Sequence, residues 1–441
     1  MRMIRFLLTA AAAAALLHAQ DFTTRADKYI NPLVEQNQFI GSVLVARDGK
    51  PIFRKGFGLA DREWNIPNGP DTKFRLGSIT KQFTATAILQ LVEAGKLKTE
   101  DPVSKYYTDA PASWSKITIH NLLTHTSGIP SYTEIPGFFQ KQAMFDLTPA
   151  EIVKLTEDKP LDFEPGEKWK YDNSGYILLG YVIEKVSGQT YADYIRQHIF
   201  EPLGMHDTGY DNTKDILPHR ASGYVYQGGR WQNAPYLAMT LPYAAGSLYS
   251  TVDDLLIWDQ ALYAGKPLTA ASFEKMFTPY KNGYGYGWGI GKQFDHKQIS
   301  HGGGINGFST VISRFPDDKV TVIVLSNMQS PAVGRIGSAL AGMVFGIDPV
   351  VHSEIKIESK LLDDYAGVYT LPPGAFTIAR DGDRLMGGPE GQRAQPLIPY
   401  DRDKFFVRAA ETELEFRRDP QGKVIELVVR QNGDEIRGAR K

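Results

Sequence analysis

The sequence of 441 residues contains no cysteine. This absence excludes a disulfide framework, a thiolate zinc site, an iron–sulfur cluster and a cysteine nucleophile. Neither sign of charge is in excess, because 49 Lys and Arg residues stand against 50 Asp and Glu residues and the formal net charge is −1. The chain therefore has no global attraction for nucleic acid, and we expect no nucleic-acid partner. Its 42% of hydrophobic and 11% of aromatic residues can form a large core, which excludes wholesale disorder.

Several catalytic motifs are also missing. The sequence has no Gly-x-Ser-x-Gly elbow, no His-Glu-x-x-His zinc motif and no phosphate loop ending in Gly-Lys-Ser/Thr. His120 and His125 are five residues apart and do not share a helical face, so we interpret them as structural. The glycine run 302–304 is not followed by Lys-Ser/Thr and is weak support for a phosphate site. We therefore expect no metal and no cofactor.

The N-terminus has the pattern of a signal peptide. Arg2 and Arg5 precede an apolar stretch from Phe6 to Leu17, and the small residue Ala19 follows. Twelve residues are too few to cross a bilayer, which needs roughly 20 in helical form. We predict a signal peptide over residues 1–19, although Leu17 fits the small-residue preference before the cut poorly; the alternative is a buried Ala-rich helix. The mature protein is expected to be exported, to the periplasm or outside a bacterial cell, without a membrane span.

The order of periodic segments indicates an α/β domain over residues 20–346. Asp48-Gly49 lies between two β-rich runs, which predicts a hairpin over 41–57. Helical periodicity follows at 78–94, 177–186 and 255–262, and two further strands are expected at 307–315 and 320–325, before a helix at 336–345. Strands at both ends with helices between them predict one antiparallel sheet, flanked by helices, that carries an inserted helical region.

The composition changes after a polar connection, which we place at 347–360. Residues 361–441 show short alternating runs separated by Asp381-Gly382, the Asp419–Gly422 turn and Asn432-Gly433. This spacing is typical of a small antiparallel barrel or sandwich. We expect a lipocalin-like barrel. It carries no recognisable catalytic set, so it either covers the cleft, makes a homo-oligomer contact or is purely structural.

A Ser-x-x-Lys pair on a helix can bring an amine within hydrogen-bond reach of a hydroxyl, because positions i and i+3 share a face. The sequence contains four such pairs, which are Ser78/Lys81, Ser113/Lys116, Ser272/Lys275 and Ser353/Lys356. Only Ser78 begins a long amphipathic helix, where the backbone N–H groups and the helix dipole favour the anionic form of a serine. We therefore expect Ser78 to be the nucleophile and Lys81 its partner.

The sequence is similar to the serine β-lactamase and penicillin-binding-protein superfamily, in particular its class C-like branch of S12 peptidases and related esterases. The resemblance covers about residues 25–346. It depends on five segments that occur in the family's order: 74–81 (FRLGSITK), 119–128 (IHNLLTHTSG), 163–176 (FEPGEKWKYDNSGY), 244–250 (AAGSLYS) and 300–308 (SHGGGINGF).

The resemblance implies roles for further residues. Tyr-x-Asn occurs at Tyr171, Tyr210 and Tyr280, but only Tyr171 follows the family's Pro-Gly approach and precedes a helix. It implies that Ser78 forms an acyl-enzyme, that Lys81 and Tyr171 act as general base and later general acid, and that Asn173 holds side chains and substrate. The third motif falls on His301-Gly302-Gly303, and backbone N–H groups of Ser78 and Gly304 are expected to form the oxyanion hole.

Two departures from the best-known β-lactamases set the expected function. The Ser-Asp-Asn motif is missing, and His301 stands where Lys of the Lys-Thr-Gly motif would supply a fixed cation for a β-lactam carboxylate. We therefore expect an exported serine hydrolase that acts on small molecules or short peptides, most of all a peptidase for D-amino-acid-containing peptides. A carboxylesterase with weak β-lactamase activity and a penicillin-binding sensor that does not turn over are the alternatives.

Overall fold

The computed structural model describes residues 21–349, 354–372, 374–392, 394–407, 412–431 and 434–441. The predicted signal peptide and Ser353 lie outside the described residues. The chain divides into two compact units, Met1–Pro349 and Val350–Lys441, and each is described by itself.

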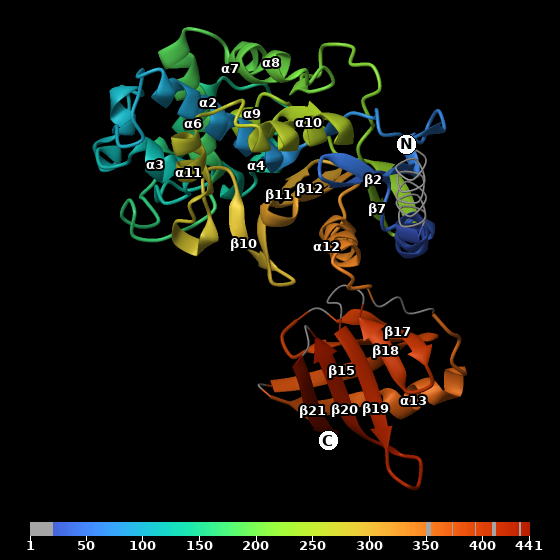
Figure 1. The fold of residues 1–441 in the computed structure, drawn as a ribbon. Helices are drawn as coiled ribbons and strands as arrows, with labels where there is room; N and C mark the ends of the chain where they lie inside the picture. Colours follow the sequence, from blue (N-terminus) through green and yellow to red (C-terminus); the bar gives the residue numbers. More distant parts are fainter. Residues whose placement is uncertain (1–20, 350–353, 373, 393, 408–411, 432–433) are drawn as a thin grey trace, which may run out of the picture. The chain divides into compact units, whose positions relative to one another are not determined.

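The first unit is built on a six-stranded antiparallel sheet with the order β10-β11-β12-β13-β1-β2 (Figure 1). Its strands are β1 Gly41–Arg47, β2 Lys50–Phe57, β10 Gly289–Gln293, β11 His296–Ile305, β12 Phe308–Phe315 and β13 Val320–Ser326. The Asp48-Gly49 hairpin is confirmed, with both residues in the left-handed region at φ 50° and 72°. β1 also pairs with β13 from Gly41↔Ser326 to Arg47↔Val320, so strands from both ends of the unit share one sheet, as predicted.

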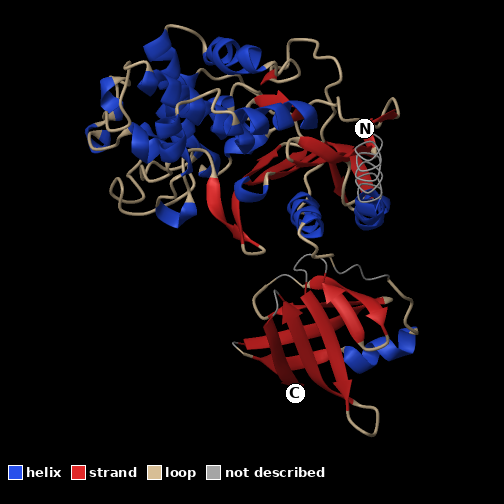
Figure 2. Ribbon diagram, viewed as in Figure 1, coloured by secondary structure: helices blue, strands red, loops and turns tan. Residues whose placement is uncertain are grey.

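The helical region is inserted between β2 and β10 in the chain, and most of the helices that Figure 2 shows in the first unit belong to it. Its helices are α2 Thr80–Glu93, α3 Ile119–Leu123, α4 Phe138–Lys141, α5 Pro149–Glu157, α6 Asn173–Ser187, α7 Tyr191–Ile195, α8 Glu201–Leu203, α9 Tyr243–Gly246, α10 Val252–Tyr263 and α11 Ala270–Phe277. Short strands lie between them: β3 Leu59–Asp61, β4 Ile66–Pro67, β5 Phe74–Arg75, β6 Gly209–Tyr210, β7 Tyr224–Gln227, β8 Arg230–Asn233 and β9 Leu248–Ser250. α2 is buried along most of its length and forms the centre of this region.

Separate apolar clusters lie on the two faces of the sheet. One joins the helical region to inward side chains such as Leu44, Ile312 and Ile323. The other packs the helix over residues 21–35 and α12 Ala332–Val344 against alternate positions such as Val43 and Val324. The central strands β1 and β13 are therefore buried almost continuously, because both of their faces are covered.

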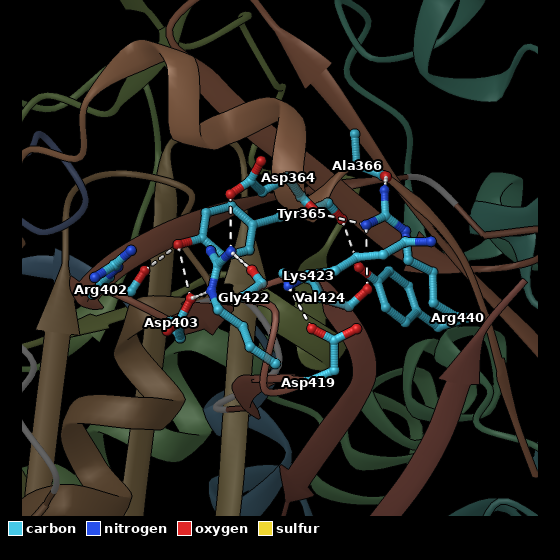
Figure 3. Close-up of polar contacts among 12 residues, drawn as sticks. Asp364, Tyr365, Ala366, Arg402, Asp403, Asp419, Gly422, Lys423, Val424 and Arg440 are labelled. Atoms are coloured by element: carbon cyan, nitrogen blue, oxygen red, sulfur yellow. Dashed lines mark hydrogen bonds and ion pairs between the residues drawn. The ribbon is translucent and has the colours of Figure 1, made fainter.

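The second unit is a closed antiparallel barrel of eight strands, which confirms the barrel prediction. The strands are β14 Gly367–Leu371, β15 Gly374–Asp381, β16 Arg384–Pro389, β17 Gln395–Asp401, β18 Lys404–Val407, β19 Thr412–Arg418, β20 Val424–Gln431 and β21 Asp434–Arg440. Closure removes free sheet edges. The short helix α13 Leu362–Tyr365 is tied to the barrel by polar contacts, because Arg418 donates to the carboxylates of Asp364 and Asp403 (Figure 3).

Two local features differ from prediction. The helix expected from Ser78 begins as a short 3-10 turn, η1 Gly77–Ile79, and becomes α-helical at Thr80. The helix expected at 336–345 already begins at Ala332, directly after Pro331. Among the described helices, none is long and apolar enough to span a membrane.

Candidate active site

Ser78 and Lys81 lie where η1 passes into α2, and the structure brings their side chains together. Nζ of Lys81 is 3.0 Å from Oγ of Ser78. Gly77 has φ +56°, a conformation that favours glycine, and a Cβ there would lie 2.8 Å from the backbone nitrogen of Gly304. Glycine at position 77 therefore allows the Ser78 turn to approach strand β11.

The Lys81 amine is fully buried and has three oxygen neighbours. Besides Ser78, Nζ donates to Oδ1 of Asn173 at 2.9 Å and to the carbonyl oxygen of Ala245 at 2.9 Å. Burial lowers the pKa of Lys81 to about 7, and the negative charge of Asp172 opposes this change. A neutral amine has two N–H groups and one lone pair. The two carbonyl oxygens can only accept, so in that state the lone pair is left for the Ser78 hydroxyl.

Tyr171, Asp172 and Asn173 form the N-terminal entry to α6. Asp172 is the N-cap, and its carboxylate accepts hydrogen bonds from the backbone N–H groups of Ser174 at 2.7 Å and Gly175 at 3.0 Å. Burial raises the pKa of Asp172 to about 7, and those backbone hydrogen bonds act against the rise. The cap fixes the first turn of α6, which directs Asn173 towards Lys81.

The Tyr171 hydroxyl is buried and has no hydrogen-bond partner of good geometry among the described residues. Burial raises its pKa well above the ordinary value, while the Ser78 side chain acts to lower it. Nζ of Lys81 lies 4.9 Å from the centre of the Tyr171 ring, and the His125 ring packs on the same ring at 4.3 Å. Tyr171 is therefore held as a protonated phenol between Lys81 and His125.

His301 is buried on β11 with both ring nitrogens engaged. Nδ1 lies 2.6 Å from the carbonyl oxygen of Gly302, so Nδ1 carries the proton and Nε2 accepts from the Tyr284 hydroxyl at 2.9 Å. Burial and the charge of Lys81 lower the pKa of His301 to about 4. At neutral pH the imidazole is uncharged and supplies no fixed cation.

β11 carries three consecutive glycines, at 302–304, whose surroundings differ. A Cβ on Gly303 would lie 1.9 Å from the carbonyl oxygen of Leu76, whereas one on Gly304 would meet nothing within 4 Å. β10 pairs with β11 only from His296 to Ser300, so the stretch 301–305 has no strand partner on that edge in the described sheet. Position 303 is thus closely packed, while position 304 faces open space.

A cavity of about 180 Å³ opens beside Ser78. Ser78, Asn173 and Gly304 line it on one side, and none of its lining residues is charged. The apolar part of the wall comes from Phe138 and Phe139, the segments around Leu237 and Leu241–Gly246, and Ile305. Uncharged polar side chains complete it, from Tyr132, Thr133, Asn306 and Gln329. The arrangement fits an uncharged, largely apolar group next to the hydroxyl.

The competing motif matches lie elsewhere. Lys116 is exposed near Glu164. The backbone N–H of Ser272 donates to Oγ1 of Thr269, the N-cap of α11, and Lys275 is exposed. The Tyr210 hydroxyl donates to the carbonyl oxygen of Met239, and Tyr280 is half exposed. Of the motif pairs within the described chain, only Ser78/Lys81 and Tyr171/Asn173 contribute to the site around the Ser78 hydroxyl.

Several contacts of this arrangement have no counterpart among the sequence predictions. His125, which is predicted to be structural, accepts a hydrogen bond at Nδ1 from the backbone N–H of Asp172 at 3.1 Å. Its ring also supports Tyr171, a contact that the sequence does not indicate. The Ala245 carbonyl and Tyr284 carried no sequence signal for their contacts with Lys81 and His301, although Ala245 lies in a family segment. His120 instead contacts the Tyr286 hydroxyl, and no described cluster of His, Asp and Glu side chains could hold a metal ion.

Comparison with known proteins agrees with this geometry. Residues 26–341 match the family described as Beta-lactamase, and residues 352–440 match a domain of unknown function (DUF3471). The chain is 37% identical to the putative penicillin-binding protein PbpX of Bacillus subtilis, over 72% of this chain and 78% of that protein. It is 33% identical to penicillin-binding protein 4* of the same organism, over 87% and 91% of the two chains.

A solved structure of a D-stereospecific amidohydrolase from Streptomyces is also similar. It superposes with a TM-score of 0.59 and 29% identity, over 69% of this chain and 94% of that one. The Beta-lactamase match alone spans most of this chain. The chain therefore belongs to the β-lactamase and penicillin-binding-protein superfamily of serine hydrolases, as its motifs predicted.

Proposed function

We propose that the protein is an exported hydrolase that forms an acyl-enzyme on Ser78 and cleaves amide bonds in short peptides that contain D-amino acids. The observation that carries this proposal is the surrounding of Lys81. Two carbonyl acceptors take the two N–H groups of its neutral amine and leave its lone pair 3.0 Å from the Ser78 hydroxyl. A buried amine with a pKa of about 7 is a suitable base near neutral pH.

Acylation follows from this geometry. Ser78 Oγ attacks the substrate carbonyl carbon while its proton moves to Nζ of Lys81, which becomes an ammonium with three acceptors already in place. The oxyanion that forms is bound by the backbone N–H groups of Ser78 and Gly304. One such donor typically contributes about 3 kcal/mol to the stabilisation of the transition state.

The leaving amine needs a proton when the carbon–nitrogen bond breaks. The Tyr171 hydroxyl can donate it, because its raised pKa keeps the phenol protonated, and Lys81 then returns its proton to Tyr171. Water next attacks the ester on Ser78, passes its proton to this pair of side chains and releases the acid together with the restored serine hydroxyl. His125 supports the Tyr171 ring and is a positioning residue in this scheme.

The uncharged walls support amide or ester substrates over β-lactams. His301 is neutral, and no charged side chain lines the cavity beside Ser78, so a β-lactam carboxylate has no fixed cation there. The similarity to a D-stereospecific amidohydrolase supports peptides with D-residues. The unpaired edge of β11 at 301–305 offers backbone groups along which an extended peptide can lie.

The test is a panel of D- and L-aminoacyl p-nitroanilides, p-nitrophenyl esters and a chromogenic cephalosporin, with Ser78→Ala as control. We expect the D-aminoacyl anilides to be turned over fastest relative to their uncatalysed rates, and Ser78→Ala to be inactive. Turnover restricted to esters would make the protein a carboxylesterase. Stoichiometric labelling by a β-lactam without turnover of any substrate would make it a sensor.

The Tyr171 assignment has a matched control in Tyr210, which belongs to the same Tyr-x-Asn pattern but hydrogen-bonds Met239. Tyr171→Phe is expected to lower kcat at least a hundredfold with little change in KM, because the lost proton transfer contributes typically 10² to 10⁴. Tyr210→Phe is expected to change kcat little. Equal losses in both variants would refute the assignment.

A further inference from the structure

A second cavity adjoins the one that contains Ser78. Its volume is about 620 Å³, and Leu237 and Asn306 line both cavities. Most of its wall comes from residues 213–223 and 233–237 of the first unit, and Phe308 of β12 completes it. The two cavities are therefore neighbours that share a wall.

Two arginines on one carboxylate distinguish this second cavity. Nε of Arg75 is 2.6 Å from Oδ2 of Asp211, and Nη1 of Arg220 is 2.8 Å from Oδ1 of the same residue. The Asp211 side chain is only 1% exposed, whereas those of Arg75 and Arg220 are 15% and 27% exposed, and both arginines line the cavity. The carboxylate is thus enclosed, while the guanidinium groups reach the cavity.

The charges leave an excess of one positive unit. Asp211 neutralises one of its two arginines, and the other lining ions, Lys214 and Asp215, balance each other. Asn233, also in the wall, donates to Glu63, which is exposed. Ser222, another wall residue, donates to Asp61 at 3.3 Å, so the positive charge that an anion would meet is local to the two guanidinium groups.

The guanidinium groups also have unused donors. Among the described residues, Arg75 donates only through Nε and Arg220 only through Nη1, which also contacts the carbonyl oxygen of Asn212 at 3.1 Å. None of the remaining guanidinium nitrogens of either residue is a buried atom without a partner, so solvent reaches them. Such donors bind carboxylates well, because the planar guanidinium matches both carboxylate oxygens.

The position of the first cavity tells which part of a substrate would reach these arginines. Ser78 and Gly304 line it, but Lys81, Tyr171 and His301 do not. In the proposed mechanism the leaving amine lies at the Tyr171 hydroxyl, so the cavity beside Ser78 accommodates the acyl part. The second cavity extends the acyl side beyond Leu237 and Asn306.

We infer that the Arg75–Arg220 pocket binds a carboxylate in the acyl part of the substrate. This inference rests on the proposed function and narrows its substrate class. The acyl part carries an uncharged, mainly apolar group next to the scissile carbonyl, and an acidic group one residue or more further from it. An acidic peptide has this chemistry, and so does an amino acid amide whose nitrogen is acylated by a dicarboxylic acid.

The test measures binding to the full chain with Ser78→Ala, so that no turnover interferes. The probes are N-glutaryl-D-phenylalanine amide and its neutral isostere, in which the terminal carboxylate is a primary amide. We expect the acid to bind about tenfold more tightly or better, as one charge-assisted contact provides, and this preference to fall with added salt. Arg220→Gln is expected to bring the ratio close to one, and Arg220→Lys to keep part of it.

Arg196→Gln is the matched control, because Arg196 also bridges two carboxylates but lines neither cavity. Two outcomes would overturn the inference even if Arg220→Gln does not fold. One is equal affinity of the Ser78→Ala protein for both probes, and the other is a preference for the acid that does not depend on salt. An equal loss of both probes in Arg220→Gln would assign the arginine a structural role and overturn it as well. Failure of the proposed function would show separately, as wild-type turnover that does not depend on Ser78.

Discussion

The pKa of Lys81 predicts how the activity depends on pH. Burial lowers this pKa from 10.5 to about 7, a difference that corresponds to roughly 5 kcal/mol between the two protonation states. A lysine with the ordinary value would hold only about 0.03% of its amine neutral at pH 7, whereas Lys81 holds about half. Burial therefore raises the population of free base by about three orders of magnitude at that pH.

The measurement is kcat/KM for a reactive p-nitrophenyl ester between about pH 5 and pH 9. We expect it to rise about tenfold per pH unit below 7 and to level off above it, because one proton must leave Lys81. Asp172→Asn is expected to move this limb to lower pH, because the negative charge that raises the pKa of Lys81 is lost while asparagine still caps α6. Asp254→Asn, which changes another buried acid, should leave the limb in place.

Two results would refute this reasoning. A kcat/KM that still rises about tenfold per pH unit at pH 9 would mean that Lys81 is not the base or is not desolvated. A limb that Asp172→Asn leaves unmoved would remove the electrostatic link between Asp172 and Lys81. The wild type and the variants are measured with the same ester, so a difference between their pH profiles comes from the protein and not from the substrate.

The same pKa has a consequence for stability with a definite sign. Because the folded-state pKa of Lys81 is below the unfolded value, the unfolded chain binds more protons between about pH 7 and 10.5, and this group's contribution to the free energy of unfolding rises with pH there. The destabilisation that results from burying a charged Lys81 is largest below pH 7. Denaturant titrations of the wild type and Lys81→Met should therefore converge as the pH rises through this window, and parallel curves would contradict the assignment.

Three further variants test the packing. Gly303→Ala should destabilise the fold by about 3 kcal/mol and abolish activity, because its Cβ would clash with a main-chain carbonyl at 1.9 Å. Gly302→Ala should be tolerated, because its Cβ would lie 3.6 Å from the carbonyl oxygen of Thr310, and urea unfolding compares the two variants. Tyr284→Phe removes the donor to a buried imidazole and should cost about 1–2 kcal/mol by thermal unfolding, and an unchanged midpoint would contradict the hydrogen bond. Arg418→Ala removes the ion pairs with Asp364 of α13 and with Asp403, and it should lower the local stability of the second unit by about 2 kcal/mol, which hydrogen exchange measures. Arg384→Ala, at an exposed pair, should have little effect.

The parts of the fold that were predicted correctly follow from local rules or simple topology. The Asp48-Gly49 hairpin needs only residues that accept positive φ, and the long helices show their period in the sequence. β1 and β13 are far apart in the sequence, yet their pairing could be predicted because strands were expected at both ends of one domain. The 3-10 turn at Ser78 was not predictable in this way, because close approach of β11 to Gly77 determines it.

The candidate site divides similarly. Ser78, Lys81, Tyr171 and Asn173 could be selected among repeated motifs by their sequence neighbours. The acceptor on Ala245 and the donor on Tyr284 could not, because a backbone carbonyl has no sequence signature and Tyr284 meets His301 only through the tertiary fold. The altered pKa values depend on burial, which is a property of the folded protein and not of a motif.

Departures from ordinary stability rules gather around the Ser78 hydroxyl. Lys81 and Asp172 are buried ionisable groups, the Tyr171 hydroxyl lacks a partner, and Tyr243 has φ 38°, which costs energy in a bulky residue. Tyr243 opens α9, and a side chain at Gly180 would meet its ring at 2.4 Å, so α9 is pressed against α6. This packing holds the Ala245 carbonyl at 2.9 Å from Lys81. If these groups served stability alone, we would expect paired charges and a relaxed backbone. The buried ionisable groups and the strained backbone at Tyr243 are explained if the fold maintains an amine that must give up and regain a proton.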